Sequence, residues 1–358
     1  MQRAERVIRA GKEQGLHRGA QLFVHHRGQT VCDQAFGEAQ PDVAMRNTTP
    51  MLWMSAGKPL AAVAMLQQIE RGRATLDTRV AQVLPAFARN GKDAITIRHL
   101  LTHTAGFRGP LNSFTPGPWE AIIERVCRLK QEPGWTPGEK AGYHVGSSWF
   151  ILGELVRLLD GRRYEQYVRE EIFARVGVNT STVGLLSIEE YDARTTSIVA
   201  PDFPGNHPVD ALTVCRPGAN ARGPIRDLAQ FYISLLNHDG RLLSSEMSRQ
   251  MVARQREGMF DHTFKEITDW GWGVKLDSKR YKTREERPEQ YGYGLHASDQ
   301  TFGHSGNQCS CAFADPAHDL VVAWCTNGMP GEAAHQERQN AINTAIYEDL
   351  KLASGSMA

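Results

Sequence analysis

Apolar residues occupy every position from Pro59 to Leu66, and Ile69 continues the run before Gly72 ends it. A helix that is apolar on all sides is usually buried, so this pattern predicts a central core helix. Proline is tolerated in the first turn of a helix but clashes deeper inside it. Pro59 therefore places the predicted helix start near Ser55.

The segments around this helix show two spacings of apolar residues, one typical of strands and the other typical of helices. Residues 20–26 and 30–37 are rich in β-formers and predict a hairpin after a first helix. Three-and-four spacing predicts further helices over residues 97–107, 118–131, 147–161, 164–177, 227–240 and about 332–352. Strand-like runs cover residues 271–276, 300–306, 309–315 and 319–328, and a frayed tail is expected over 353–358.

This order predicts an α+β fold in which both ends of the chain contribute to one antiparallel sheet. Terminal helices would cover the sheet, and a mainly helical region would be inserted between its two halves. We expect a sheet domain formed by residues 1–75 and 205–358 and a helical domain formed by residues 76–204. A cleft should lie where the two parts meet.

Composition points to a small-molecule ligand. The chain has 41 basic and 40 acidic residues, a formal net charge of +1, so no global field recruits nucleic acid or a membrane surface. No segment reads as a membrane span, and the first twenty residues are charged and amphipathic, unlike a secretory signal. Six dispersed cysteines fit reduced core thiols. We therefore expect a cytoplasmic protein.

Ser55 and Lys58 are the first candidates for chemistry. Three residues apart at a helix start, they share one face, and the unpaired N–H groups of the first turn offer donors to an oxyanion. Burial disfavours a charged lysine and lowers its pKa, which makes Lys58 a candidate base. No other serine in the chain has a lysine three residues later. The alternative is a helix-capping Ser55 and a solvated Lys58.

Two more segments carry candidate side chains. Tyr143 follows a Pro/Gly turn and precedes an apolar helix, where its hydroxyl would face the cleft. In "FGHSGNQCSCAFADP", His304, Ser305, Gly306 and Asn307 lie on a strand that would line the other wall.

Together these segments resemble the serine β-lactamase and penicillin-binding-protein superfamily, particularly its class C-like branch of esterases and acyltransferases. "MSAGK" is similar to that family's Ser-x-x-Lys motif, "AGYHV" to its Tyr-x-Asn motif, and "GHSGN" to its Lys-Thr-Gly or His-x-Gly motif. Residues 97–107, 135–144 and 218–231 add supporting matches. The resemblance covers most of the chain and implies a β-lactamase-like fold.

The resemblance also implies roles for these residues. Ser55 would be the nucleophile, Lys58 the group that activates it, and Tyr143 the proton relay to the leaving group and later from the acceptor. The backbone N–H groups of Ser55 and Asn307 would form the oxyanion hole. No metal or organic cofactor is implied.

Two departures from the family motifs bear on the substrate. Val145 stands where the family has an asparagine that holds a substrate amide, so esters or thioesters become more plausible than β-lactams or peptides. His304 stands in place of a lysine, which leaves a mostly neutral imidazole where a fixed charge would bind a carboxylate. Together with His304, Ser305, Gly306 and Asn307, Val145 is a candidate substrate-binding or oxyanion residue.

Three other interpretations remain open. A nucleophile elbow at Ser305 lacks the required second glycine, because Asn307 stands there. A metal site would use His304, Cys309 and Cys311, the cysteines facing one side of a strand, but no second ligand pair in standard spacing appears. A non-catalytic scaffold would be expected to have lost the acyl-transfer residues.

The sequence thus predicts a serine hydrolase that acts on a small carboxylic ester or thioester through an acyl-enzyme on Ser55. The alternative within the enzyme class is an acyltransferase of specialised metabolism that passes the acyl group to a small alcohol or amine. Both share the acyl-enzyme and differ in what resolves it.

Overall fold

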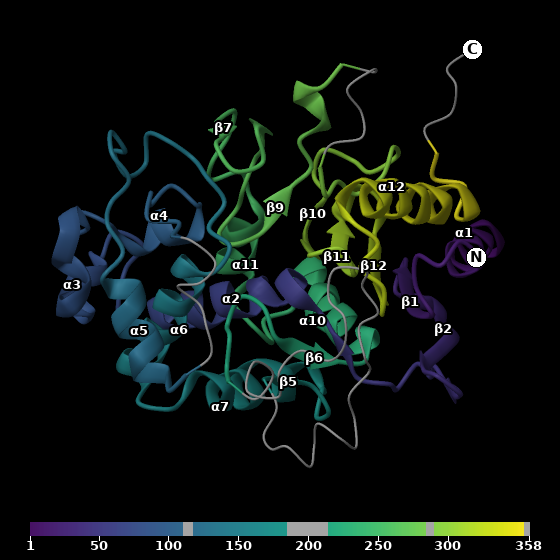
Figure 1. Cartoon of the computed structure of the whole chain (residues 1–358), viewed down its shortest axis with the longest axis horizontal. Coiled ribbons are helices and arrows are strands. Elements are labelled where there is room, and N and C mark those ends of the chain that lie inside the picture. Colours follow the sequence, from purple (N-terminus) through teal and green to yellow (C-terminus); the bar gives the residue numbers. More distant parts are fainter. Residues whose placement is uncertain (110–116, 185–213, 284–289, 354–358) are drawn as a thin grey trace.

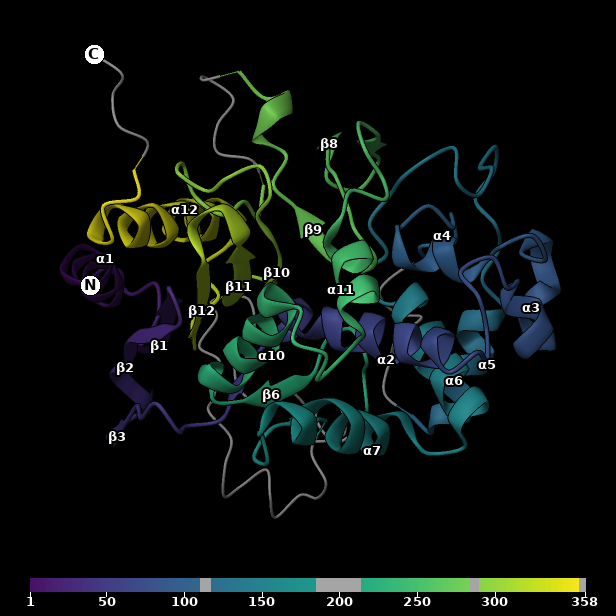
Figure 2. The same cartoon turned by 180° about the vertical axis from the view of Figure 1, so that it is seen from behind.

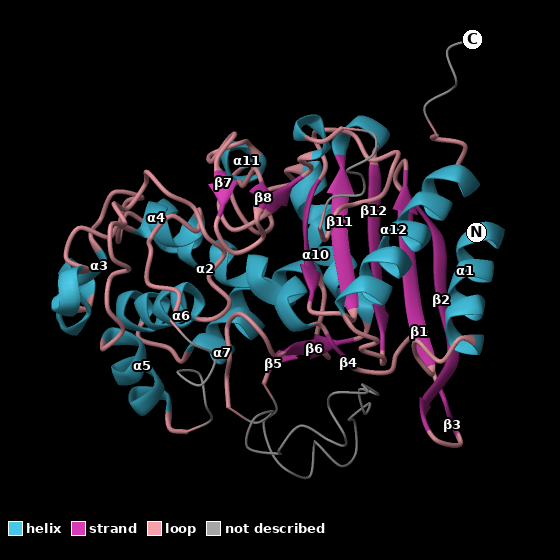
Figure 3. Cartoon of the chain, turned by 45° about the horizontal axis from the view of Figure 1, so that its top comes forward, coloured by secondary structure: helices cyan, strands magenta, loops and turns pink. Residues whose placement is uncertain are grey.

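The main sheet of the protein joins the two ends of the chain. The structure is a computed structural model that describes residues 1–109, 117–184, 214–283 and 290–353. Within these ranges the sheet has seven antiparallel strands in the order β3-β2-β1-β12-β11-β10-β9 (Figure 3). Their bounds are β1 (Gly19–His26), β2 (Gln29–Gln40), β3 (Val43–Ala44), β9 (Lys275–Leu276), β10 (Phe302–Gly306), β11 (Ser310–Asp315) and β12 (Leu320–Thr326). The predicted α+β fold with a sheet from both chain ends is confirmed.

Successive side chains of a strand point to opposite faces, so the sheet has a hydrophobic core on each of its two faces. Leu22 and Trp324 pack beneath the two terminal helices, whereas Phe23 and Ala323 face the opposite layer. The N-terminal and C-terminal helices lie side by side, and Arg3 pairs with Glu348 between them (Figure 1). The helices covering the sheet are α1 (Gln2–Glu13), α12 (Glu332–Asp349), α10 (Ile225–Asn237) and α2 (Lys58–Glu70). Viewed from behind, α10 lies against β11 and β12 (Figure 2).

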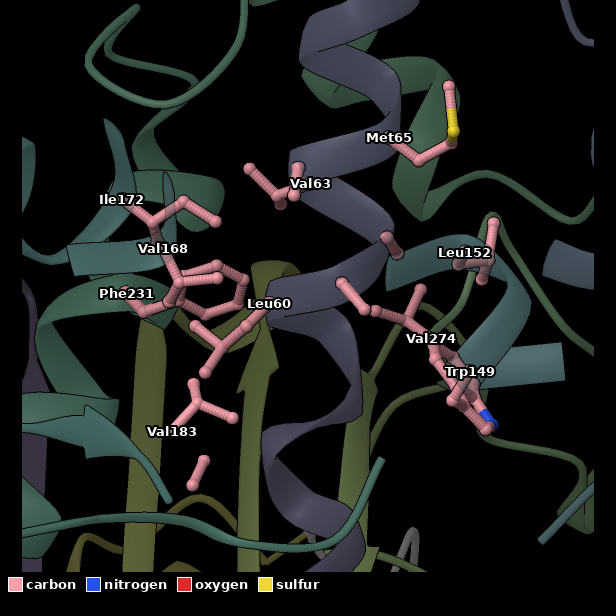
Figure 4. Packing of buried hydrophobic residues seen from close by; sticks show 14 of the residues in the cluster. Leu60, Val63, Met65, Trp149, Leu152, Val168, Ile172, Val183, Phe231 and Val274 are labelled. Atoms are coloured by element: carbon pink, nitrogen blue, oxygen red, sulfur yellow. The ribbon is translucent and has the colours of Figure 1, made fainter. Parts of the chain in front are cut away.

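Helix α2 is the buried core helix that the sequence predicted, with every residue from Lys58 to Gln68 buried. Leu60 and Val63 face Ile172 and Phe231 on one side, and the other side of the helix faces Leu152, Trp149 and Val274 (Figure 4). An apolar surface all round is stable here because other elements surround the helix.

The segment between the two halves of the sheet is mainly helical, and its helices gather at the end of the molecule away from both termini (Figure 1). They are α3 (Val80–Val83), α4 (Ile97–Leu101), α5 (Trp119–Cys127), α6 (Ser147–Asp160) and α7 (Tyr164–Val168). The bounds that we predict for the two domains remain a prediction.

Several predicted elements are shorter than expected. The helix predicted over 97–107 ends at Leu101, because His103 has a left-handed backbone (φ 58°) that an α-helix cannot contain. The strand predicted over 271–276 is reduced to Lys275–Leu276, after a turn at Gly273 (φ 76°). The predicted frayed tail falls largely on residues 354–358, outside the described residues.

Smaller elements complete the fold. A second sheet joins β4 (Met51–Leu52), β6 (Ala221–Gly223) and β5 (Thr182–Val183), and a hairpin joins β7 (Phe260–Asp261) to β8 (Glu266–Ile267). Helix α11 (Ser245–Val252) lies between α10 and that hairpin in sequence. None of the helices in the described ranges combines the length and apolar character that crossing a bilayer requires.

Candidate active site

Ser55 lies in a 3₁₀ turn, Met54–Gly57, that leads directly into α2. The sequence predicted Ser55 and Lys58 in one α-helical first turn, and this detail is wrong because α2 begins at Lys58. A 3₁₀ turn has three residues per turn, so positions i and i+3 eclipse. The first residue of the turn, Met54, has a left-handed backbone (φ 49°), a conformation that is costly for a residue with a side chain.

Lys58 lies directly behind Ser55 and is fully buried. Its Nζ is 2.9 Å from Ser55 Oγ and donates a hydrogen bond to the carbonyl oxygen of Gly218 at 2.6 Å. Burial holds the pKa of Lys58 well below its ordinary value. A neutral amine that gives one N–H to Gly218 can turn its lone pair toward the Ser55 hydroxyl. The geometry is therefore that of a base beside a nucleophile.

Tyr143 completes a group of three around the serine. Its hydroxyl hydrogen-bonds with the Ser55 side chain, and its ring lies 5.4 Å from Lys58 Nζ. Burial raises the pKa of Tyr143 above its ordinary value, and the hydrogen bond with Ser55 only partly opposes this shift. The phenol therefore stays protonated at neutral pH and can donate a proton, while Lys58 remains the better base.

Asp261 fixes the backbone of Tyr143. The buried carboxylate accepts hydrogen bonds from the Tyr143 N–H at 3.0 Å and from Arg256 Nη2 at 3.0 Å. Thr263 donates from its hydroxyl to the Tyr143 carbonyl at 3.1 Å. Sequence reasoning missed Asp261, since an isolated Asp 118 positions from its partner leaves no local motif.

The far wall of the site is the end of β10 and the turn that follows. A Cβ added to Gly306 would lie 2.2 Å from the carbonyl oxygen of Trp53, so only glycine lets β10 approach the serine turn this closely. This approach carries Asn307, the predicted oxyanion residue, to the same cleft as Ser55.

His304 is buried and neutral, as the sequence predicted for this position. Its Nδ1 donates to the Ser305 carbonyl at 2.7 Å, which leaves Nε2 as an acceptor without a partner among the described residues. Burial, reinforced by the charge of Lys58, lowers the pKa of His304 to about 3. His304 therefore offers the site a hydrogen-bond acceptor and no positive charge at neutral pH.

Ser305 turns its hydroxyl toward the layer of α12. The hydroxyl donates to Cys311 Sγ at 3.4 Å and accepts from Gln339 Nε2 at 3.0 Å. A hydroxyl held in this way inside a strand does not provide the exposed nucleophile of the alternative interpretation.

One cleft of about 570 Å³ collects the predicted residues. Ser55, Tyr143, Val145 and Asn307 line it, together with His304 and Ser305, while Lys58 and Gly306 lie in the layer beneath. The remaining lining is largely apolar and includes Met54, Gly146, Phe150, Ala219, Phe264, Trp270 and Tyr291. Of these, sequence reasoning singled out Trp270 alone. The cleft has room for an acyl group and a second small molecule.

The predicted metal alternative finds no support in this geometry. Cys309 precedes β11 and packs with Met329, whereas Cys311 lies in the cluster below α12, so the two cysteines do not share a face. In the ranges that the structure describes, no group of three or more His, Cys, Asp or Glu side chains is placed to hold a metal ion.

Of the four aromatic residues Trp53, Phe107, Trp270 and Trp272, three lie away from the cleft. Trp272 and Phe107 belong to the core, and Trp53 donates from its indole to the Gly223 carbonyl, whereas Trp270 lines the cleft. The segment over residues 108–118 lies largely outside the described residues, as does part of the segment over 277–300.

Comparisons with known proteins agree with this geometry. The chain matches the family model described as Beta-lactamase over residues 4–345. It is 27% identical over 287 residues to penicillin-binding protein 4 of Amycolatopsis lactamdurans, covering 76% of this chain and 71% of that protein. It is 31% identical over 159 residues to monacolin J acid methylbutanoyltransferase of Aspergillus terreus, a match that covers 38% of each chain.

Solved structures are similar over nearly the whole chain. A penicillin-binding protein homologue from Caulobacter crescentus has a TM-score of 0.77 at 25% identity, covering 97% of this chain and 96% of that one. Other similar proteins carry the names of esterases and acyltransferases.

Proposed function

Because this chain belongs to the beta-lactamase family, we propose that it is a serine hydrolase that forms an acyl-enzyme on Ser55 from a small carboxylic ester or thioester. The observation that carries the proposal is the contact of Ser55 Oγ with the buried Lys58 amine at 2.9 Å, beside a protonated Tyr143.

The proposed reaction follows from this arrangement. Lys58 takes the Ser55 proton as the oxygen attacks the substrate carbonyl, and the N–H groups of Ser55 and Asn307 stabilise the oxyanion. Tyr143 donates a proton to the leaving group as its bond to the acyl carbon breaks. Water then attacks the acyl-enzyme and gives a proton back to Tyr143, Lys58 returns its proton to the Ser55 oxygen, and the acid is released.

Ester or thioester substrates fit the cleft better than amides. Val145 is 43% exposed and lines the cleft where an amide-binding side chain would be needed. An apolar wall leaves the polar atoms of an amide unpaired, whereas an ester has fewer polar atoms to satisfy.

The second candidate function is acyl transfer to a small alcohol or amine. Two features favour it: the largely apolar lining of the cleft, with Phe150, Phe264 and Trp270, and the acceptor Nε2 of His304. Such a lining limits water near the acyl-enzyme, and the imidazole lone pair can accept a hydrogen bond from an incoming hydroxyl or amine.

We further propose a small-molecule substrate without nucleic-acid or membrane partners, and a cytoplasmic location. The near balance of charge and six cysteines with free thiols support these proposals.

The deciding experiment is rapid-quench intact mass spectrometry with a panel of esters and thioesters. We expect the parent to gain the mass of the acyl group and the Ser55→Ala variant to gain none. Adding alcohols or amines separates the two candidate functions, since a transferase makes new ester or amide in proportion to acceptor. If neither adduct nor turnover appears with any donor, the scaffold interpretation holds instead.

A further inference from the structure

Arg216 is a cation on the wall of the cleft whose charge the mechanism does not use. Its side chain lines the cleft with Ser55 and Tyr143, and its Nε is buried without a hydrogen-bond partner in the part of the chain that the structure describes. Burial lowers the pKa of Arg216, and no carboxylate among the described residues counters this shift. Arg216 is only half-buried, but a buried guanidinium N–H normally has a partner, so its unpartnered Nε is a candidate donor to a ligand in the cleft.

Hydrogen bonds stabilise the turn that carries Arg216, and the same turn binds the amine of Lys58. The Arg216 N–H donates to Asn220 Oδ1 at 2.8 Å, and the Arg216 carbonyl accepts from Ala219 N–H at 2.9 Å. Gly218, two residues on, gives its carbonyl to Lys58. Two residues span at most about 7 Å, so the backbone of Arg216 lies close to the carbonyl that binds Lys58.

The electrostatic character of the cleft agrees with an anionic ligand. Among the described lining residues the cations are Arg216 and Lys275, and no carboxylate is among them. Gly146, the N-cap of α6, lines the same cleft and adds the positive end of a 14-residue helix. His304 is neutral, so it does not provide the charge for such a ligand.

We propose that Arg216 binds a carboxylate on the substrate, so that the preferred acyl donors are monoesters or monothioesters of dicarboxylic acids. The guanidinium would hold the distal carboxylate by paired N–H donors while the esterified carbonyl lies at Ser55. This substrate class rests on the proposed acyl-enzyme function.

The kinetic test compares two donors of equal chain length, the para-nitrophenyl monoester of adipic acid and para-nitrophenyl hexanoate. We expect the ratio of kcat/KM for the anionic over the neutral donor to fall roughly 10- to 100-fold in Arg216→Gln, the range of a charge-assisted hydrogen bond. Arg216→Lys should retain part of the preference. Arg241→Gln is the control, because Arg241 pairs with Asp239 outside the cleft. A ratio that stays within about threefold of the parent in Arg216→Gln overturns the proposal.

A binding test separates this proposal from the proposed function. Isothermal titration of monomethyl adipate and methyl hexanoate into Ser55→Ala needs no acyl transfer. We expect tighter binding of the anionic ester, lost in Ser55→Ala/Arg216→Gln. If Ser55 is never acylated but this difference is found, the anion site stands and the proposed function fails. If the two esters bind alike, the anion site is wrong whatever the fate of Ser55.

Discussion

The amine of Lys58 donates a hydrogen bond to the carbonyl oxygen of Gly218 across 2.6 Å, although the two residues are 160 positions apart in sequence. The bond fixes the direction of the amine, and a Cβ at Gly218 would crowd Lys58 Nζ at 3.1 Å and Trp149 at 2.9 Å. A backbone carbonyl thus takes the orienting place that a carboxylate would otherwise fill, and it adds no formal negative charge that would raise the lysine pKa.

Replacing Lys58 with methionine should abolish most of the acylation rate. A well-positioned general base contributes about 10²- to 10⁴-fold, so we expect a loss of that size in kcat/KM for an activated ester. Lys58→Arg should not restore the rate, because a guanidinium keeps its proton. Thermal unfolding of both variants checks that they fold. A Lys58→Arg enzyme close to parental activity would contradict the assignment of Lys58 as base.

The rate of acylation should rise with pH as Lys58 loses its proton. The pKa of Lys58 is held well below 10.5 by burial, so the rise should be complete below that pH. The groups that face Lys58 from other elements are Tyr143, His103 and His304. The pKa of each imidazole is shifted below its ordinary value and that of Tyr143 above it, so none should add a transition near neutrality. Pre-steady-state release of para-nitrophenol across pH measures the profile, and the rising limb should vanish in Lys58→Met.

Gly306→Ala should weaken the oxyanion hole. The added methyl group would meet the Trp53 carbonyl and Ser310 Oγ, each at 2.2 Å, and would push β10 away from Ser55. Loss of one oxyanion donor costs about 10²- to 10³-fold in kcat. Gly117→Ala is a matched control, because its Cβ would meet only Arg125 at ordinary contact distance, 3.7 Å or more. Equal kcat in the two variants would show that the approach of β10 is not needed.

Arg338 on α12 is a positioning residue for the same turn. It is buried and donates to the carbonyl oxygens of Gln308 at 2.8 Å and Gly328 at 3.1 Å. Arg338→Met removes the donor to the Gln308 carbonyl and leaves Gly328 only its longer contact from the Thr326 hydroxyl at 3.4 Å, so we expect a loss of about 1–3 kcal/mol in the free energy of unfolding. We also expect kcat to fall more than KM changes, because Gln308 is next to Asn307.

The control for Arg338 is Arg3→Met on α1. Arg3 pairs with Glu348 on the surface and is 54% exposed, so its removal should cost about 1 kcal/mol or less. Urea unfolding and steady-state kinetics on both variants provide the comparison. A kcat that falls in step with the folded fraction alone would mean that Arg338 does not position the turn.

Sequence reasoning identified candidate catalytic residues where they lie beside a helix with a clear apolar pattern. Ser55, Lys58 and Tyr143 could be predicted because each stands next to an apolar helix whose pattern is clear. The 3₁₀ turn at Ser55 could not, since spacing of three residues fits both a 3₁₀ turn and an α-helix. The strands β4 and β5 also escaped detection, because two residues show no period.

The groups that orient the candidate catalytic residues were invisible for a different reason. Gly218 acts through its backbone carbonyl, which every residue type possesses, and Asp261 and Arg338 act over long sequence distances. Arg216 stands in a turn without a recognisable motif, and only its place in the cleft and its Nε, which has no partner among the described residues, draw attention to it. Burial and pairing are tertiary properties, so residue spacing does not reveal them.

The site can form only after β12 has been synthesised, because β12 pairs with β1 at the centre of the sheet. During synthesis Ser55 leaves the ribosome early, whereas β12 ends at Thr326, so the centre of the sheet stays open until most of the chain has emerged. Until then the edge of β1 that pairs with β12 stays open, and an unpaired strand edge favours aggregation. A growing polypeptide therefore carries Ser55 for most of translation without β10 and Asn307, the part of the site that follows it in the chain.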